Sequence, residues 1–267
     1  MAEPPVIVEK SEHILTVTLN RPEKRNAVNS QVMCLLHEAW NQLDEDDDLR
    51  VAILTGNGTT FCAGMDLSEI GLMRVDPPAN EWIARVREEP RIIYHAWLKT
   101  DVPTKPVILA VEGVARAGGT EILQGTHLRV AGESAVFGIT EVQRGLFPMA
   151  GSAVRLRRQI GYALAAEMLL CGADITAQRA LEAGLINYVV PDGQALAKAR
   201  ELAARIASNG PLAVKALVAT LRDTESLTEA EAFPIEQRHG GAVMASEDAM
   251  EGPRAFLEKR APVFQGR

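Results

Sequence analysis

The stretch Val107–Glu121, VILAVEGVARAGGTE, decides the fold class of this chain. Its five apolar residues predict a buried strand that stops at Gly113, and its Gly118-Gly119 pair precedes a predicted helix start. A second segment follows the same plan, because Val51–Gly56 is an apolar run with a glycine end, and Phe61–Leu67 (FCAGMDL) follows it. Recurring strands, turns and helices predict a mixed α/β fold.

Both segments end where a helix is predicted to begin. A helix start presents unpaired backbone N–H groups and the positive end of the helix dipole. Glycine allows a ligand to approach the backbone closely. Two such ends that face each other could donate two N–H groups to one oxygen atom, which is an oxyanion hole. A Gly–Gly pair before a helix more often reflects tight packing, so this pattern leaves both interpretations open.

The remaining patterns divide the chain into two parts. The first part holds strands and helices mixed, and the second is almost entirely helical. In the first part we expect a hairpin of Val6–Val8 with Ile14–Leu19, a helix Gln31–Asp44 capped by Ser30, and short strands Arg129–Ala131 and Val136–Phe137. The segment Gly71–Glu89 is expected to be an irregular loop or short helices. In the second part we expect helices Ala195–Ala207, Pro211–Arg222, Ser226–Ala245 and Ser246–Lys259. We therefore predict a core of residues 1–195 and a helical region of residues 196–267.

Charge and cysteine usage narrow the class of protein. The net charge of −7 argues against nonspecific binding to nucleic acid or to an anionic membrane. The cysteines Cys34, Cys62 and Cys171 lie far apart without metal-ligand spacing, which predicts reduced thiols and no metal site. The N-terminus has no signal-peptide pattern, and the apolar runs are far shorter than the ~20 residues that cross a bilayer. We therefore expect a cytoplasmic protein.

Two glutamates stand out as candidates for chemistry. Glu121 lies three residues after Gly118 in a mostly apolar helix, and Glu141 directly follows an apolar strand. Either glutamate alone would most simply be a solvated surface residue, whereas two that converge near a polarised carbonyl would form a general acid–base pair. Spacing does not show that they converge. Asp66-Leu67-Ser68-Glu69 fits a capping box, so Asp66 is expected to be structural.

Several motifs together resemble the crotonase, or enoyl-CoA hydratase/isomerase, superfamily. They occur in the family's order along nearly the whole chain: Asn20–Ala27 (NRPEKRNA), Phe61–Leu67, Glu112–Glu121, Phe137–Gly151 and Glu251–Arg260. Three further stretches resemble actinobacterial enoyl-CoA hydratases, some of which act on steroid side-chain thioesters: Ala117–Thr126, Arg129–Ala135 and Ser152–Ile160. The resemblance implies a spiral of ββα units with a C-terminal helical region that builds homotrimers, commonly paired into hexamers.

The resemblance also implies roles for particular residues. It places the oxyanion hole at the N–H groups of Met65 and Gly118, and the catalytic carboxyls at Glu121 and Glu141. The other implied contacts are with coenzyme A at Arg25, Ala63 and Lys259, the last from a neighbouring subunit, and with the acyl chain at Met149. For Arg25 and Lys259, a solvated surface charge is the alternative. The substrate is then an acyl-CoA thioester, with no cofactor and no metal. We expect the acyl group to pass over the Cα of Gly118, where only glycine leaves space.

Retention of both glutamates favours hydration of a trans-2-enoyl-CoA to a 3-hydroxyacyl-CoA, in fatty-acid or steroid side-chain β-oxidation. The alternatives are an enoyl-CoA isomerase that relies on Glu141, and a non-catalytic member that binds acyl-CoA or RNA. The dehalogenase branch is excluded because Met149 stands at the position of its nucleophilic aspartate. The acyl chain itself cannot be inferred. Its pocket is expected within Gly71–Leu98, where Trp82, Tyr94, His95 and Trp97 line either the core or the pocket.

Overall fold

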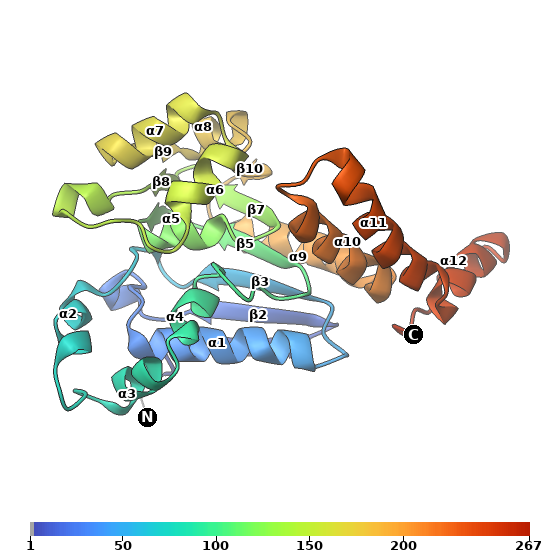
Figure 1. Ribbon diagram of the computed structural model, residues 1–267, viewed down its shortest axis with the longest axis horizontal. Helices are drawn as coiled ribbons and strands as arrows, with labels where there is room; N and C mark the ends of the chain where they lie inside the picture. Colours follow the sequence, from blue (N-terminus) through green and yellow to red (C-terminus); the bar gives the residue numbers. More distant parts are fainter. Residues whose placement is uncertain (1–2) are drawn as a thin grey trace.

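The computed structural model describes residues 3–267 and contains two β-sheets with helices around them (Figure 1). Its strands are β1 (Val6–Ser11), β2 (Ile14–Leu19), β3 (Val51–Gly56), β4 (Thr60–Cys62), β5 (Val107–Val111), β6 (Val114–Arg116), β7 (Leu128–Gly132), β8 (Val136–Gly138), β9 (Asp174–Thr176) and β10 (Tyr188–Val190). Its α-helices are α1 (Ser30–Glu45), α2 (Leu67–Ile70), α3 (Glu81–Glu88), α4 (Arg91–Ala96), α5 (Gly118–Leu123), α6 (Ser152–Gln159), α7 (Tyr162–Cys171), α8 (Ala177–Glu182), α9 (Ala195–Ala207), α10 (Pro211–Thr224), α11 (Glu229–Met244) and α12 (Glu247–Leu257). Three short 3₁₀ helices are η1 (Pro22–Lys24), η2 (Leu72–Arg74) and η3 (Glu141–Arg144).

Each repeating unit contributes one strand to each sheet. The six-stranded sheet has the order β1-β2-β3-β5-β7-β10, and the four-stranded sheet has the order β4-β6-β8-β9. The consecutive pairs β3/β4, β5/β6 and β7/β8 therefore pass from the large sheet to the small one, and a helix follows each pair. Parallel pairing of β4, β6 and β8 stacks the ends of the units side by side. The predicted spiral of ββα units is confirmed.

Apolar residues fill both faces of the large sheet. One buried cluster lies between the sheets and α1, where Trp40 and Phe61 are fully buried. A second cluster lies on the opposite face, where small residues of α9 such as Ala199 and Ala203 pack against β3, β5 and β7. Helix α9 thus packs on the sheet although it follows residue 195. The division of the chain at residues 195 and 196 stays a prediction.

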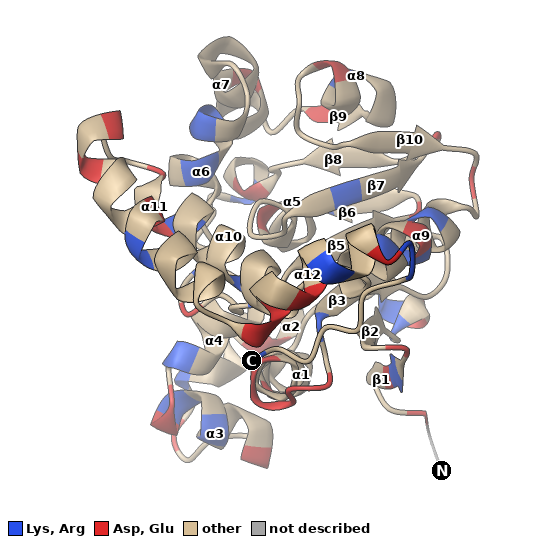
Figure 2. Ribbon diagram, turned by 90° about the vertical axis from the view of Figure 1, so that its right-hand side faces the viewer, with Lys and Arg blue, Asp and Glu red and all other residues tan. Residues whose placement is uncertain are grey.

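The last three helices extend away from the sheets as an arm (Figure 1). Helices α10 and α11 pack on each other, and both acidic and basic residues occur along the arm (Figure 2). The arm also exposes large apolar side chains: Leu217, Leu221, Phe233, Met244, Met250, Phe256 and Leu257. Large exposed apolar patches are rare in monomeric soluble proteins and mark interaction surfaces. The arm therefore has the character of an interaction surface.

Local details correct two of the expectations. The N-cap of α1 is Asn29, whose side chain accepts from the N–H of Val32, while Ser30 is the first residue of the helix. Asp66 caps α2 through the N–H of Ser68, but Glu69 does not complete a capping box, because its carboxylate accepts from the N–H of Ser30 instead. The hairpin of β1 with β2 is as expected. Within residues 3–267, every helix is too short or too polar to span a bilayer.

Candidate active site

The register of the small sheet brings the two candidate carboxylates together. Arg116 at the end of β6 pairs with Gly138 at the end of β8, and the N–H of Ala117 donates to the Gly138 carbonyl at 2.8 Å. Glu121 lies five residues beyond the first strand end, and Glu141 lies three residues beyond the second. The two glutamates converge because β6 and β8 pair in parallel, although these strands are not consecutive in the chain.

Glu121 is a buried carboxylate at the start of a helix. It is 3 % exposed, and its Oε1 accepts from the N–H of Ser152 at 3.1 Å. Ser152 is the first residue of α6, so Glu121 meets the positive end of that helix dipole. Burial raises the pKa of Glu121, while hydrogen bonds from Ser152 and Ala150 and the charge of Lys99 oppose that rise. The site therefore supplies groups that stabilise the ionised form of Glu121.

Glu141 has a different environment. Burial raises its pKa to about 7, and the negative charge of Glu121 adds to that rise. A hydrogen bond with the Glu121 carboxyl group raises it further, so the two side chains are in contact. Within residues 3–267, the buried Oε2 of Glu141 has no hydrogen-bond partner. A protonated Glu141 beside an ionised Glu121 agrees with the raised pKa of Glu141 and with the hydrogen bonds that Glu121 accepts.

Backbone N–H groups face the same region. The Val28 N–H donates to the Gly64 carbonyl, and the Asp66 N–H donates to the Val28 carbonyl, each at 2.8 Å. Because the backbone alternates in direction, the N–H of Met65 points away from Val28. The N–H of Gly118 begins α5 and has no partner within the helix. Among the described residues, neither N–H donates to another protein group.

Gly64 sets the spacing between these two donors. Its φ is +94°, and a Cβ built on it would lie 2.7 Å from the Cβ of Ala117 and 3.0 Å from the backbone nitrogen of Gly118. A side chain at position 64 would therefore push the Met65 loop away from the start of α5. The structure brings the Met65 loop close to Gly118, and the role of these two residues as an oxyanion hole stays a prediction.

The reason given for glycine at position 118 was wrong. A Cβ there would lie 2.5 Å from the ring of Trp97, which is 5 % exposed and belongs to the core. The space beside the Gly118 Cα is thus filled by the indole ring and is not open to a ligand. At Gly118, glycine is therefore needed for packing against Trp97, while its N–H has no partner among the described residues.

The other predicted contact residues divide into two groups. Arg25 and Ala63 are neighbours, since the Ala63 N–H donates to the Arg25 carbonyl at 3.0 Å, two residues before Met65. Met149 is 58 % exposed, and its carbonyl accepts from the Lys99 ammonium at 2.7 Å. Lys259 follows α12 at the far end of the helical arm, so a single chain does not bring it to Glu121 (Figure 1).

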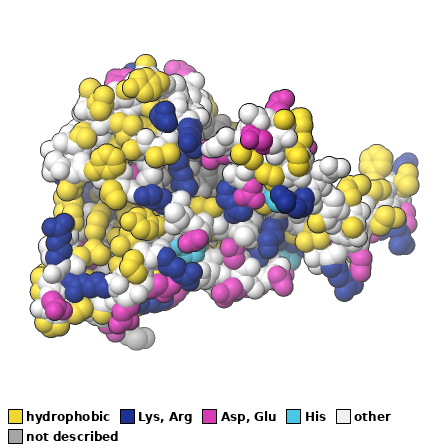
Figure 3. Space-filling model, viewed as in Figure 1, with side chains coloured by type: hydrophobic (Ala, Val, Ile, Leu, Met, Phe, Trp, Pro, Cys, Tyr) yellow, Lys and Arg dark blue, Asp and Glu magenta, His cyan; other side chains and the backbone are white. Residues whose placement is uncertain are grey.

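Aromatic residues of the predicted pocket segment lie in the core or at its margin. His95 is 6 % exposed, and its Nδ1 lies 2.7 Å from Nδ1 of His37, so it is a packed residue of the core. Trp97 is also buried, while Trp82 and Tyr94 are half-buried. Apolar side chains gather instead on the face that carries α2, α5 and α6 (Figure 3). On the loop after Glu141, the exposed ones include Leu146 and Phe147.

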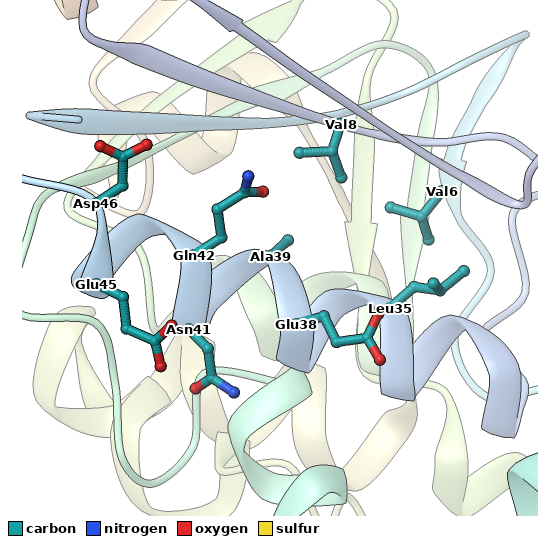
Figure 4. Close-up of a pocket in the computed structure, with 9 residues that line it drawn as sticks. All are labelled: Val6, Val8, Leu35, Glu38, Ala39, Asn41, Gln42, Glu45 and Asp46. Atoms are coloured by element: carbon teal, nitrogen blue, oxygen red, sulfur yellow. The ribbon is translucent and has the colours of Figure 1, made fainter. Parts of the chain in front are cut away.

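An open groove elsewhere does not suit an acyl-CoA. It lies between β1 and α1, has a volume of about 600 Å³, and is lined by Val6, Val8, Leu35, Glu38, Ala39, Asn41, Gln42, Glu45 and Asp46 (Figure 4). Among residues 3–267, three carboxylates and no basic side chain line this groove, so it offers no cation to the phosphates of coenzyme A.

Sequence reasoning missed three residues that surround Glu121. Ser152 and Gln124 form a hydrogen-bonded chain beside it, and Lys99 ties the α4–β5 segment to the Met149 loop. A Gly-Ser pair before a helix is the only local signal for Ser152, and it indicates a helix start rather than a contact with a carboxylate. Residues this far apart in sequence become neighbours only through the fold.

Comparisons with known proteins agree with this geometry. The profile of the enoyl-CoA hydratase/isomerase family matches residues 9–267. The chain is 54 % identical to enoyl-CoA hydratase EchA19 of Mycobacterium tuberculosis, over 99 % of this chain and 97 % of the relative. It is 36 % identical to 2,3-dehydroadipyl-CoA hydratase of Escherichia coli, over 98 % and 99 %. A crystal structure of enoyl-CoA hydratase from Mycobacterium tuberculosis H37Rv superposes with a TM-score of 0.88 at 40 % identity, covering 99 % and 100 %. The protein is therefore an enzyme of the enoyl-CoA hydratase/isomerase family, within the crotonase superfamily that its motifs predicted.

Proposed function

We propose that this protein adds water to a trans-2-enoyl-CoA and forms a 3-hydroxyacyl-CoA. The observation that carries the proposal is the interaction between two carboxyl groups in unlike environments, Glu121 being buried and Glu141 half-buried. Glu121 receives hydrogen bonds that favour its charge, whereas the pKa of Glu141 is raised to about 7, so much of Glu141 keeps its proton at neutral pH. Two carboxyls that differ in this way supply a base and an acid in one site.

The proposed reaction uses each carboxyl once. Glu121 takes a proton from water as the water oxygen bonds to C3 of the enoyl group. Glu141 gives its proton to C2, so the double bond is lost and the proton count of the pair is unchanged. The proton then returns from Glu121 to Glu141 across the contact between them. The unpartnered Oε2 of Glu141 is available to the reacting atoms.

The thioester oxygen gains negative charge as water attacks. The N–H groups of Met65 and Gly118, which are unpaired among the described residues and held close by Gly64, fit that oxygen. Each donor of this kind contributes about 10²–10³ to the rate. In this proposal Arg25 and Ala63 contact coenzyme A, which is supported by the hydrogen bond that joins them two residues before Met65.

Assembly completes this proposal. The exposed apolar arm fits a homotrimer or homohexamer, in which Lys259 of a neighbouring subunit could contact coenzyme A. Static light scattering at micromolar concentration tests the assembly, and a monomer would contradict it.

The proposal extends to the acyl group of the substrate. Exposed apolar residues near Glu141, including Phe147 and Met149, favour a hydrophobic acyl chain of fatty-acid or steroid side-chain type. Relatives with different acyl groups in their names, such as 2,3-dehydroadipyl-CoA hydratase, show that this family varies there.

The deciding experiment measures hydration of trans-2-enoyl-CoA esters with short, long and steroid-type acyl chains. The same enzyme is offered 3-enoyl-CoA esters, and retention of RNA on a filter is measured in parallel. Hydration of at least one ester at rates above those of isomerisation supports the proposal. Isomerisation alone, or binding without turnover, would instead support one of the alternatives.

A further inference from the structure

The side chain of Gln124 is linked to Glu121 through Ser152. Gln124 is 3 % exposed, and its Nε2 donates to the Ser152 Oγ at 2.7 Å and to the Thr120 carbonyl at 3.1 Å. Ser152 is fully buried and donates its N–H to the Glu121 carboxylate at 3.1 Å, and its hydroxyl group acts to lower the pKa of Glu121. The three side chains form one chain of contacts inside the core.

The directions of these hydrogen bonds follow from the donors and acceptors present. The Thr120 carbonyl can only accept, so the amide of Gln124 must turn its NH₂ group toward it. Both amide hydrogens are then committed, one to Thr120 and one to the Ser152 oxygen. Because Ser152 Oγ already accepts from Gln124, its own hydrogen is free to donate to the Glu121 carboxylate.

The buried amide is retained at a cost. The Oε1 of Gln124 has no hydrogen-bond partner within residues 3–267, and an unpaired buried oxygen destabilises a folded protein. A methionine of similar volume would fill this position without that cost. Among residues 3–267, the only polar contacts of the Gln124 side chain are the two hydrogen bonds that it donates.

We propose that Gln124 and Ser152 are positioning residues, in which Gln124 orients the Ser152 hydroxyl and that hydroxyl holds the Glu121 carboxylate toward the reacting water. The proposal rests on the base role proposed above for Glu121. These hydrogen bonds keep the pKa of Glu121 below that of Glu141. Without the hydroxyl donor, the two pKa values become more alike, and the shared proton moves toward Glu121.

The test compares Ser152→Ala and Gln124→Met with the wild type. Ser152→Ala keeps the backbone N–H to Glu121 and removes only the hydroxyl group. We expect its kcat to fall about tenfold to a hundredfold, with KM changed less than threefold, because a hydrogen bond to a charged group is lost. The acidic limb of its kcat–pH profile should move up by about one pH unit. Gln124→Met should shift the same limb by less, while its melting temperature stays equal or rises.

Two controls separate positioning from general damage. Thr126→Val removes another buried hydroxyl, which donates to the Leu123 carbonyl at 2.7 Å and has no contact with Glu121, so its pH profile should match the wild type. In a Glu121→Gln background, Ser152→Ala should cause no further loss of kcat. An equal loss in both backgrounds, or an unshifted acidic limb, overturns the positioning role.

A measurement without turnover distinguishes this proposal from the proposed function. Infrared titration of the carboxyl pair in the wild type and in Ser152→Ala reports protonation of Glu121 and Glu141 directly. A higher pKa of Glu121 in the variant supports the positioning role even if no enoyl-CoA ester is hydrated. The lack of hydration would overturn the hydratase function alone. Identical titrations overturn the positioning role whatever the activity.

Discussion

Replacing Glu141 with glutamine removes a carboxyl group that the folded protein holds at a raised pKa of about 7, compared with 4.5 for an unperturbed glutamate. Between those values the folded state binds more protons than the unfolded state, so the stability that this group contributes falls as pH rises from about 4.5 to 7. Above pH 7 the destabilisation is complete. At 1.36 kcal/mol for each unit of pKa, its upper limit is about 3 kcal/mol. Glu141 is only partly buried, so we expect roughly half of that.

Glutamine fills the same space without a charge, so Glu141→Gln should melt above the wild type at alkaline pH. A gain of about 1–2 kcal/mol corresponds to roughly 2–8 °C for a chain of this size. The gain should shrink by more than half at pH 5.5, where both forms carry little charge at this position. In the same preparation, the hydration rate should fall by about 10²–10⁴, because the proton donor is lost.

The assay is thermal unfolding of both proteins between pH 5.5 and 8.5 at one concentration, with hydration of one enoyl-CoA ester measured alongside. A variant that is equally stable at every pH, or less stable at alkaline pH, would show that Glu141 is not held protonated by its site. Glu23, exposed and with no side-chain contact to the pair, provides the matched Glu→Gln control, which should not change the pH dependence.

Three further outcomes follow from the same structure. Glu121→Gln should lower kcat by about 10²–10⁴ while the Kd for a CoA ester stays nearly constant, and a variant that keeps more than half of the hydration rate would remove Glu121 from the mechanism. Gly118→Ala should lower the melting temperature, because its Cβ would lie 2.5 Å from the Trp97 ring, and an unchanged melting temperature would show that the ring can move aside. Burial lowers the pKa of His95 to about 4, so the wild type should lose stability as pH falls from about 6.5 toward 4. His95→Phe should flatten that loss in a pH series of melting curves, and an unaltered slope would rule out this residue as its source.

The sequence by itself determined several of the elements and the family. Strand and helix periods, glycine at strand ends and the order of motifs are properties of neighbouring residues, so they are readable before folding. The pattern at residues 107–121 predicted β5 and the start of α5, and the hairpin of β1 with β2 formed as expected. The motifs also selected Met65 and Gly118, which the fold places side by side.

Only the tertiary structure decided which residues meet. Glu121 and Glu141 converge because β6 and β8 pair in parallel with Arg116 opposite Gly138, and no local pattern encodes that register. The contact of Trp97 with Gly118 likewise joins segments from different elements. A pKa of about 7 at Glu141 depends on burial and on a neighbouring charge, which exist only once the chain is folded. Periodicity depends on adjacent residues, whereas a site depends on contacts between segments that the packed sheets bring together.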